Sequence, residues 1–145
     1  MKQITTFLID DSLFGLDTAY IRDIPVVAGV TRIPQNTAQL FDKVMRLMDG
    51  RLVHLVNTEK LLGIPNKPVS ESSRVLVLQS AGVTMGLAVD AVRNLVTVED
   101  DAVMEPLPLS KIRYEFISGI ITQGADVIVL LDMGKILTQI GMPKA

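Results

Sequence analysis

The sequence contains no cysteine and no tryptophan, and its single histidine is His54. Without cysteine the chain cannot form a disulfide, bind a metal through thiolates or use a cysteine nucleophile. One imidazole cannot supply the two or three histidines of an ordinary zinc site. Because His54 lies within the apolar stretch RLVHLV, we expect a packed or edge side chain there and not a catalytic base.

Aromatic residues and long apolar runs are also scarce. Four phenylalanines and two tyrosines accompany an apolar content of 48%, so the core of this 145-residue chain must consist mainly of Val, Ile, Leu and Met. The longest apolar run is residues 127–131, far short of the ~18 residues of a membrane span. The opening stretch MKQITTFLIDDS lacks the apolar core of a signal peptide. We therefore expect one soluble, cytoplasmic domain without direct membrane insertion.

Charged residues give no sign of a catalytic or nucleic-acid site. The 14 basic and 16 acidic residues nearly balance, and the basic ones are dispersed, so no nucleic-acid partner is expected. Asp10 and Asp11 stand in a probable-turn sequence before Ser12, where short acidic side chains bond to the local backbone. Residues 99–101 lack the spacing of a calcium loop, and neither a Gly-rich phosphate loop nor a G-x-S-x-G turn occurs. The sequence thus lacks nearly all the ordinary means of an enzyme and predicts a binding module.

Short segments rich in β-branched residues, with turn signals every 8–12 residues, predict an all-β, barrel-like protein with few short helices. Residues 3–9 alternate as a strand does, and residues 26–33 predict a strand with a kink at Gly29. Asp17 or Thr18 could cap one helical turn. Residues 64–73, with two prolines and three serines, form a linker-like segment that favours two lobes.

The chain is organised around residues 118–137, whose plan recurs 75 residues earlier in residues 43–62. Each stretch predicts a β-hairpin followed by a short helix, with Asn57 and Asp132 at equivalent helix-cap positions. The continuous apolar run of residues 127–131 predicts a strand buried on both faces. Chance similarity between two amphipathic units is the alternative to a duplicated architectural unit.

Three stretches resemble the CheW-like domain, an adaptor fold of bacterial chemotaxis. The first is FLIDDSLFGLDTAYIRDI, with Phe14-Gly15-Leu16 in place of the family's Phe-Gly-Ile and Ile21-Arg22-Asp23-Ile24 after it. The second is VLVLQSAGVTMGLAVDAVRNLVTV, which carries Gly86, Val89, Asp90 and Val92. The third is the closing FISGIITQGADVIVLLDMGKIL. Together they extend the resemblance over roughly residues 5–140.

The resemblance implies one CheW-like domain made of two small five-stranded SH3-like barrels with a groove between them. Residues 13–70 would form the first barrel, and residues 1–12 with 71–145 the second barrel and the C-terminal helix. It further implies a non-enzymatic, cofactor-free adaptor that joins the regulatory domain of a CheA-type histidine kinase to the cytoplasmic tip of a chemoreceptor. Such an adaptor would work in the cytoplasm, at receptor arrays on the inner face of the membrane.

One hairpin departs from the family pattern. Where the family carries Asn-Leu-Arg-Gly, this chain has Arg46-Leu47-Met48-Asp49-Gly50, with Met48 near the family arginine. His54 replaces a proline of the family, and Asn57-Thr58 replaces Asp-Leu. Loss of the arginine puts ordinary receptor coupling in doubt, although Arg46 or Arg51 could supply a neighbouring charge. A drifted surface residue is the alternative explanation of Met48.

Adaptors bind through exposed apolar patches with polar rims. The partner-binding candidates are the apolar Phe14, Ile24, Val26, Val44, Leu47 and Met48, with Arg46, Asp49 and Arg51 as the rim. We expect at least one apolar residue of positions 44–48 to be substantially exposed. Two other functions stay open: a divergent CheW-like regulator of motility or of another kinase pathway without receptor coupling, and a small-molecule-binding barrel or weak hydrolase that uses His54.

Overall fold

The computed structural model describes residues 1–33, 41–65, 67–80, 82–104 and 114–139, and most of these residues lie in strands. The strands are β1 (Lys2–Ile9), β2 (Ser12–Asp17), β3 (Ile21–Asp23), β4 (Val30–Arg32), β5 (Phe41–Arg46), β6 (Leu52–Val56), β7 (Arg74–Ser80), β8 (Val83–Val89), β9 (Ala91–Val98), β10 (Ile117–Gln123) and β11 (Asp126–Leu131). The helices are α1 (Thr58–Leu62) and α2 (Met133–Gln139), with 3-10 turns η1 (Thr18–Tyr20), η2 (Asp100–Ala102) and η3 (Tyr114–Phe116).

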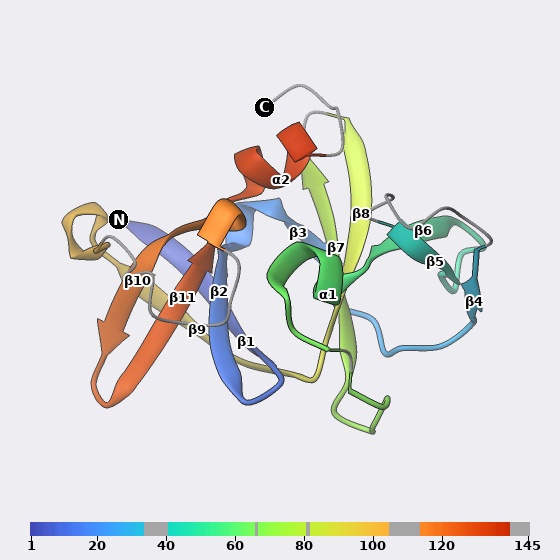
Figure 1. Cartoon of the computed structure of the whole chain (residues 1–145), viewed down its shortest axis with the longest axis horizontal. Coiled ribbons are helices and arrows are strands. Elements are labelled where there is room, and N and C mark those ends of the chain that lie inside the picture. Colours follow the sequence, from blue (N-terminus) through green and yellow to red (C-terminus); the bar gives the residue numbers. More distant parts are fainter. Residues whose placement is uncertain (34–40, 66, 81, 105–113, 140–145) are drawn as a thin grey trace.

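The strands form two sheets that pack side by side (Figure 1). One sheet has the order β10-β11-β2-β1-β9, and we call it the terminal lobe because its strands come from both ends of the chain. The other has the order β3-β7-β8-β6-β5-β4, and we call it the central lobe. The prediction of an all-β fold with two barrel-like subdomains and short helices is confirmed.

The division of strands between the lobes differs from the expected one. β2 joins the terminal lobe because it pairs in parallel with β11, where Gly15 lies opposite Leu130. β7 and β8 join the central lobe because β8 pairs in parallel with β6, where Gly86 lies opposite Leu55. Residues 64–73 therefore connect α1 to β7 of the central lobe and do not separate the lobes. The chain passes between the lobes after β2 and again at Asp90.

The two halves of the sequence follow the same plan with exchanged strands. The first half runs through the hairpin β1–β2 and then β3, β4, β5, β6 and α1; the second runs through β7–β8 and then β9, a bridge at Met104, β10, β11 and α2. In each half the opening hairpin belongs to one lobe, and the remaining elements belong to the other. The predicted hairpin-plus-helix units are confirmed, and they are the closing parts of two longer, interleaved repeats.

Both helices begin at the predicted caps. The Asn57 side chain accepts hydrogen bonds from the amides of Glu59 and Lys60, and Gly63 ends α1 in the left-handed region. The Asp132 carboxylate accepts from the Lys135 amide at 3.0 Å. Each cap satisfies amides that the first turn of a helix leaves free. Asp17 caps η1 in the same way, by accepting from the Ala19 amide.

Buried side chains form three apolar clusters. A central cluster lies between the sheets and includes Phe7 and Phe14 of the terminal lobe, Leu76 of the central lobe and both helices. Each lobe also has an inner cluster, around Ile128 in the terminal lobe and around Met45 in the central lobe. β7 serves two clusters because its side chains alternate: Leu76 and Leu78 face the central cluster, whereas Val75 and Val77 face the inner one.

The prediction that residues 127–131 are buried throughout is wrong at one end. Val127 is 53% exposed because it adjoins the hairpin turn at Gly124, beyond the covering strands. Ile128, Leu130 and Leu131 are buried as predicted, whereas Val129 is only half-buried against the central cluster. Alternation divides them as in β7, since Ile128 and Leu130 face the inner cluster of the terminal lobe and Leu131 faces the central cluster.

A glycine stands at the equivalent place in each lobe, where the two parallel strands meet. A Cβ on Gly15 would approach Ile4 and Ile128 to 2.7 and 2.8 Å. A Cβ on Gly86 would approach Leu55 to 2.6 Å and Val75 to 3.0 Å. Both glycines therefore allow a close approach between strands inside a small barrel.

Candidate docking surfaces

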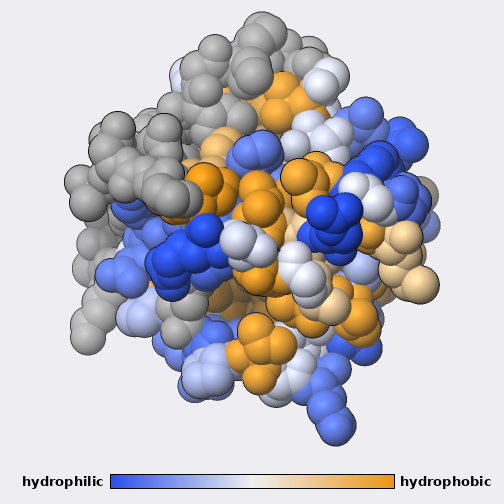
Figure 2. Space-filling view, turned by 90° about the vertical axis from the view of Figure 1, so that its right-hand side faces the viewer, coloured by the Kyte–Doolittle hydropathy of each residue, from blue (hydrophilic) through white to orange (hydrophobic). Residues whose placement is uncertain are grey.

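The central lobe carries a surface hollow of about 400 Å³ at the turn between β5 and β6. We call it the hairpin hollow; its lining is Asp23, Pro25, Val26, Ala28, Met45, Arg46, Leu47, Met48, Asp49 and Arg51. One wall is the segment that follows β3, and the other is the hairpin turn. Figure 2 shows apolar residues gathered over the middle of this side of the molecule, interrupted by hydrophilic ones. An apolar floor with a charged rim is the expected anatomy of a protein-docking surface.

The hairpin turn is held rigidly by its own backbone and by Asp49. The Leu47 amide donates to the Arg51 carbonyl at 2.8 Å, and the Gly50 amide donates to the Leu47 carbonyl at 2.9 Å. Gly50 has a φ of 89°, which glycine adopts without steric cost. Met48 is held at the tip of this turn with its side chain fully exposed. The hydrogen-bonded turn itself therefore keeps the Met48 side chain exposed.

The facing wall is attached to both hairpins of the central lobe. The Pro25 carbonyl accepts from the Val75 amide at 2.9 Å, and the Gly29 carbonyl accepts from the Arg46 amide at 3.1 Å. Val26 makes an isolated bridge with Arg74. With its backbone fixed in this way, Val26 remains 58% exposed beside the hollow.

The two arginines of the rim differ in whether they are ion-paired within the protein. Arg51 Nε lies 2.7 Å from Asp49 Oδ2, and the Arg51 amide donates to Asp49 Oδ1 at 3.0 Å. These hydrogen bonds from the Arg51 backbone and side chain lower the pKa of Asp49 below its ordinary value. Arg46 has no ion-pair partner among the described residues. Arg46 is thus the rim cation that can meet a partner without first breaking an internal pair.

The structure brings most of the predicted docking residues together at the hairpin hollow, but it buries two of them. Val26, Arg46, Met48, Asp49 and Arg51 all line the hairpin hollow, and the full exposure of Met48 confirms the expectation for positions 44–48. Ile24 is exposed next to the hollow, and Val44 is half-buried on β5.

Phe14 and Leu47 are corrections to the predicted site. Phe14 is fully buried in the central cluster, where its ring stacks on Phe7 at 6.2 Å between centroids, so it cannot contact a partner. Its motif position identified the strand but not the face on which the side chain lies. Leu47 lines the floor of the hollow but is only 7% exposed, because it belongs to the inner cluster of the central lobe.

Sequence reasoning missed Asp23, Pro25 and Ala28, which complete the second wall. It also missed exposed Val30 and Leu52 of the same lobe. The signal for Pro25 was present, because a proline directly after a strand cannot continue the hydrogen-bond ladder and marks an irregular edge.

The terminal lobe repeats several of these exposed apolar positions. Leu52 and Val127 are 75 residues apart and both are exposed after their hairpin turns. Val30 lies opposite Met45, and Met104 lies opposite Ile120, which is 75 residues after Met45; Val30 and Met104 are both exposed. Leu95 is exposed on β9, whose place at the sheet edge corresponds to that of β3. We call Leu95, Met104 and Val127 the terminal-lobe apolar set.

Other polar groups act locally. His54 is exposed on β6, and its ring meets Phe41 edge-on at 5.9 Å between centroids. Within the described residues, no three His, Cys, Asp or Glu side chains could together hold a metal ion. The search of those residues also finds no helix of the length and apolar character needed to cross a membrane.

Comparison with known proteins finds similarity to a CheW-like domain and to proteins that contain one. The CheW-like domain matches residues 3–141. "Chemotaxis protein CheW" of Treponema pallidum (strain Nichols) is 21% identical over 141 residues, covering 94% of this chain and 82% of that protein. "Probable chemotaxis protein CheW" of Rhizobium etli is 24% identical over 142 residues, covering 95% and 88%. The scaffolding protein TtCheW from Thermoanaerobacter tengcongensis has the same fold, with a TM-score of 0.79 at 24% identity over 91% of this chain and 84% of that one.

Proposed function

The chain belongs to the CheW-like domain family, and from this premise we propose that it couples a CheA-type histidine kinase to the cytoplasmic tip of a chemoreceptor. The family and the scaffolding protein of the same fold make it a non-catalytic adaptor of chemotaxis-type signalling. An adaptor of this kind needs two docking surfaces and a rigid body between them. Its place would be the cytoplasm, at receptor arrays on the inner face of the membrane.

The hairpin hollow is the observation that carries the proposal. Its floor is apolar and its rim is charged, its volume of about 400 Å³ accommodates one or two large side chains, and its turn is held by backbone hydrogen bonds. A pre-formed pocket of this type favours binding because little conformational freedom is lost when a partner docks. We assign the hairpin hollow to the receptor tip, in line with the family resemblance.

The terminal-lobe apolar set is the candidate for the kinase. Leu95, Met104 and Val127 are each at least half exposed, whereas the other large apolar side chains of β9 and β11 are mostly covered. The family resemblance also places kinase binding mainly on the lobe that contains these residues. Each apolar surface then serves a different partner, which is the minimum that coupling requires.

Arg46 is the proposed substitute for the family arginine. Met48 offers no hydrogen-bond donor, and the guanidinium of Arg51 is engaged by Asp49. Arg46 lines the same hollow with its guanidinium unpaired among the described residues. Because arginine presents directed donors that suit carboxylate and carbonyl groups, Arg46 can contact an acidic or carbonyl-rich partner.

Binding measurements with purified partners test this assignment. Calorimetry of the chain against the kinase regulatory domain and against a receptor-tip fragment should show micromolar or tighter binding to each. Met48→Asp should weaken receptor binding about ten-fold or more and leave kinase binding unchanged, since a charge enters an apolar contact. Leu95→Asp should weaken kinase binding and leave receptor binding unchanged. Lys135→Asp is the control, because Lys135 is exposed on α2 and lies outside both surfaces.

The outcomes separate the parts of the proposal. If Met48→Asp and Leu95→Asp weaken the same partner, the two surfaces do not divide the work between kinase and receptor. If Arg51→Ala weakens receptor binding more than Arg46→Ala does, Arg46 is not the substitute for the family arginine. Absence of any kinase affinity would remove the adaptor function itself.

A second function is favoured by the departure at Met48 and Asp49. If the receptor retains the acidic site that the family arginine would meet, losing one partner of a buried charged hydrogen bond costs roughly 2–5 kcal/mol. The chain would then be a divergent regulator of motility or of another kinase pathway that has lost ordinary receptor coupling. Kinase affinity without receptor-tip affinity, restored by Met48→Arg, would identify this case.

A further inference from the structure

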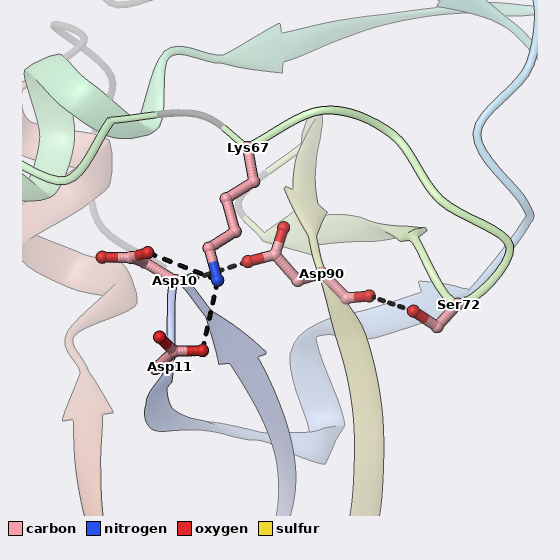
Figure 3. A network of polar contacts seen from close by, with 5 residues as sticks. All are labelled: Asp10, Asp11, Lys67, Ser72 and Asp90. Atoms are coloured by element: carbon pink, nitrogen blue, oxygen red, sulfur yellow. Dashed lines mark hydrogen bonds and ion pairs between the residues drawn. The ribbon is translucent and has the colours of Figure 1, made fainter.

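A polar network joins three segments that are distant in the sequence (Figure 3). Lys67 Nζ lies 3.2 Å from Asp11 Oδ1 and 3.4 Å from Asp10 Oδ1. The Asp10 amide donates to the Asp90 carboxylate at 2.6 Å, and Ser72 Oγ donates to the Asp90 carbonyl at 2.9 Å. The network therefore links the β1–β2 turn, the connector of residues 64–73 and the crossing at Asp90.

The position of the network gives it a bridging role between lobes. Asp10 and Asp11 belong to the turn of the terminal lobe, whereas Lys67 and Ser72 lie on the connector that leads from α1 into the central lobe. Asp90 stands where the chain leaves β8 and enters β9, and its amide donates to the Leu8 carbonyl at 2.8 Å. Lys67 is the cation of this network, and it faces carboxylates from the other lobe.

The connector itself is anchored mainly at its two ends. Ile64 is buried in the central cluster, and Ser73 is buried next to β7. Between them Lys67 and Val69 are exposed. Below the connector is a small hollow of about 40 Å³, lined by Ile9 and Val89 among other residues, where the two lobes meet. The connector thus closes over an apolar seam and has few apolar contacts of its own to hold it there.

The turn that receives Lys67 is conformationally demanding. Asp10 and Asp11 have φ values of 54° and 36°, in a region that residues other than glycine seldom adopt. Asp tolerates this region better than most residues other than glycine, as in two-residue hairpin turns, and the Asp90 carboxylate and the Lys67 ammonium contact the turn from other segments. The contacts with Asp11 and Asp10 raise the pKa of Lys67, chiefly through its hydrogen bond to Asp11. Lys67 is therefore charged throughout the physiological range.

We infer that the connector is an ionically clasped strap: Lys67, held by Asp10 and Asp11 of the other lobe, keeps residues 67–73 closed over the seam between the lobes. When the ion pairs are broken, the strap opens locally while the three apolar clusters stay intact. High salt opens it by screening, because all three charged side chains are largely in contact with solvent.

The strap also ends at the hairpin hollow. After Ser73 the chain continues into Arg74, which bridges Val26, and into Val75, whose amide donates to the Pro25 carbonyl. Pro25 and Val26 form one wall of the hollow. Opening of the strap therefore loosens that wall and weakens docking there. This last step rests on the proposed function; the clasp itself does not.

Amide exchange of the full chain, followed residue by residue by NMR, tests the clasp without any partner. The informative amides are those of Asp10, Ser73 and Val75, because each donates a hydrogen bond within or beside the network. In Lys67→Met these amides should exchange about two- to five-fold faster, as expected when exposed ion pairs are lost. Raising the salt concentration should accelerate them in the wild type but not in Lys67→Met.

The controls distinguish a clasp from general destabilisation. Lys135→Met removes an exposed lysine of α2 by the same substitution and should leave all three amides unchanged. The amides of Leu76 and Leu87, in the buried strands of the central lobe, report global unfolding and should also stay unchanged. If Lys67→Met disturbs them, Asp11→Asn provides a milder break, since asparagine tolerates a positive φ.

Exchange that is unchanged in both Lys67→Met and Asp11→Asn would overturn the clasp. Equal acceleration in Lys135→Met would overturn it as well. Faster exchange at Asp10 and Ser73 without any change at Val75 would retain the clasp and remove its coupling to the hollow. Failure of receptor binding in the wild type would concern the proposed function alone, because the exchange experiment contains no receptor.

Discussion

The two hairpin-plus-helix units share a plan and differ at their tips. In both, buried side chains of the second strand continue into a capped helix whose leucines, Leu62 and Leu137, enter the same central cluster. At the tip, however, one unit has Met48-Asp49-Gly50-Arg51 beside the hairpin hollow, and the other has a short turn at Gly124. The repeat is therefore retained where side chains face the core and has diverged at the exposed turns, one of which carries the proposed docking surface.

If the two units are equivalent in the core, truncating either leucine should have a similar and large effect. Leu62→Ala and Leu137→Ala should each lower the free energy of unfolding by roughly 2–5 kcal/mol, since each leaves a cavity in the central cluster. Urea unfolding followed by circular dichroism measures both. A cost below about 1 kcal/mol for one of them would show that its helix is peripheral and the equivalence incomplete.

The two helix caps, in contrast, should differ in how much stability their substitution costs. Asn57 accepts from two helix amides and also donates through Nδ2 to Asp42 Oδ2 at 3.1 Å, and the Asp42 side chain is buried. Asn57→Asp replaces that donor by a second carboxylate, which should cost roughly 1.5–3 kcal/mol near neutral pH. Asp132→Asn is the control, and it should cost about 1 kcal/mol or less because asparagine caps nearly as well.

The pH dependence of the Asn57→Asp variant has a definite sign. Two adjacent carboxylates raise the folded-state pKa of one of them, so the folded state binds a proton more tightly than the unfolded state does. The deficit should develop as pH rises above the ordinary aspartate value of about 3.9 and shrink as pH falls below it. A deficit independent of pH would mean that lost hydrogen bonding, and not charge repulsion, explains why asparagine stands here.

The paired glycines offer a smaller test of the same symmetry. Gly15→Ala and Gly86→Ala should each cost about 0.5–2 kcal/mol, because overpacking outweighs the gain from a less flexible unfolded chain. Gly124→Ala is unsuitable as a control, because alanine would be strained at the positive φ of Gly124. A substitution at the exposed Thr122 is the control instead. Neutral effects at both glycines would show that the barrels can relax around a methyl group.

The smallest expected effect concerns Asp49 alone. Its pKa is lowered by Arg51, so its contribution to stability is present above the ordinary aspartate value and is lost only as pH falls through the folded-state pKa. Carboxyl NMR titration should place the midpoint below about 3.9 in the wild type and nearer to it in Arg51→Met. Thermal stability near neutral pH should hardly change. An unshifted midpoint in the wild type would show that the ion pair does not persist in solution.

Local patterns predicted the units well because their signals are local. The apolar runs, the turn glycines and the caps Asn57 and Asp132 lie within about 20 residues of one another in each unit. The lobe to which a strand belongs was not predictable in this way. Membership of β2 depends on two parallel pairings between Phe14-Gly15 and Val129-Leu130, more than a hundred residues apart, and no local pattern encodes them.

The lining of the hairpin hollow was predicted in part for the same reason. The turn at Met48 and Asp49 could be located from its sequence, and the exposure of Val26 was compatible with a half-buried strand. The face of Phe14 depended on register in a sheet whose neighbours were unknown. Pro25 and Ala28 become part of the site only because their segment crosses back over the hairpin.

The exchange of strands between the halves has a consequence during synthesis. The hairpin β1–β2 leaves the ribosome first, but β11, which pairs with β2, follows about 110 residues later. At typical rates of roughly 5–20 residues per second, that interval is about 5 to 20 s. During this time one edge of β2 has no strand partner within the nascent chain. The central lobe consists of β3 to β8 and can be completed in order, whereas the terminal lobe stays open until β10 and β11 have been made.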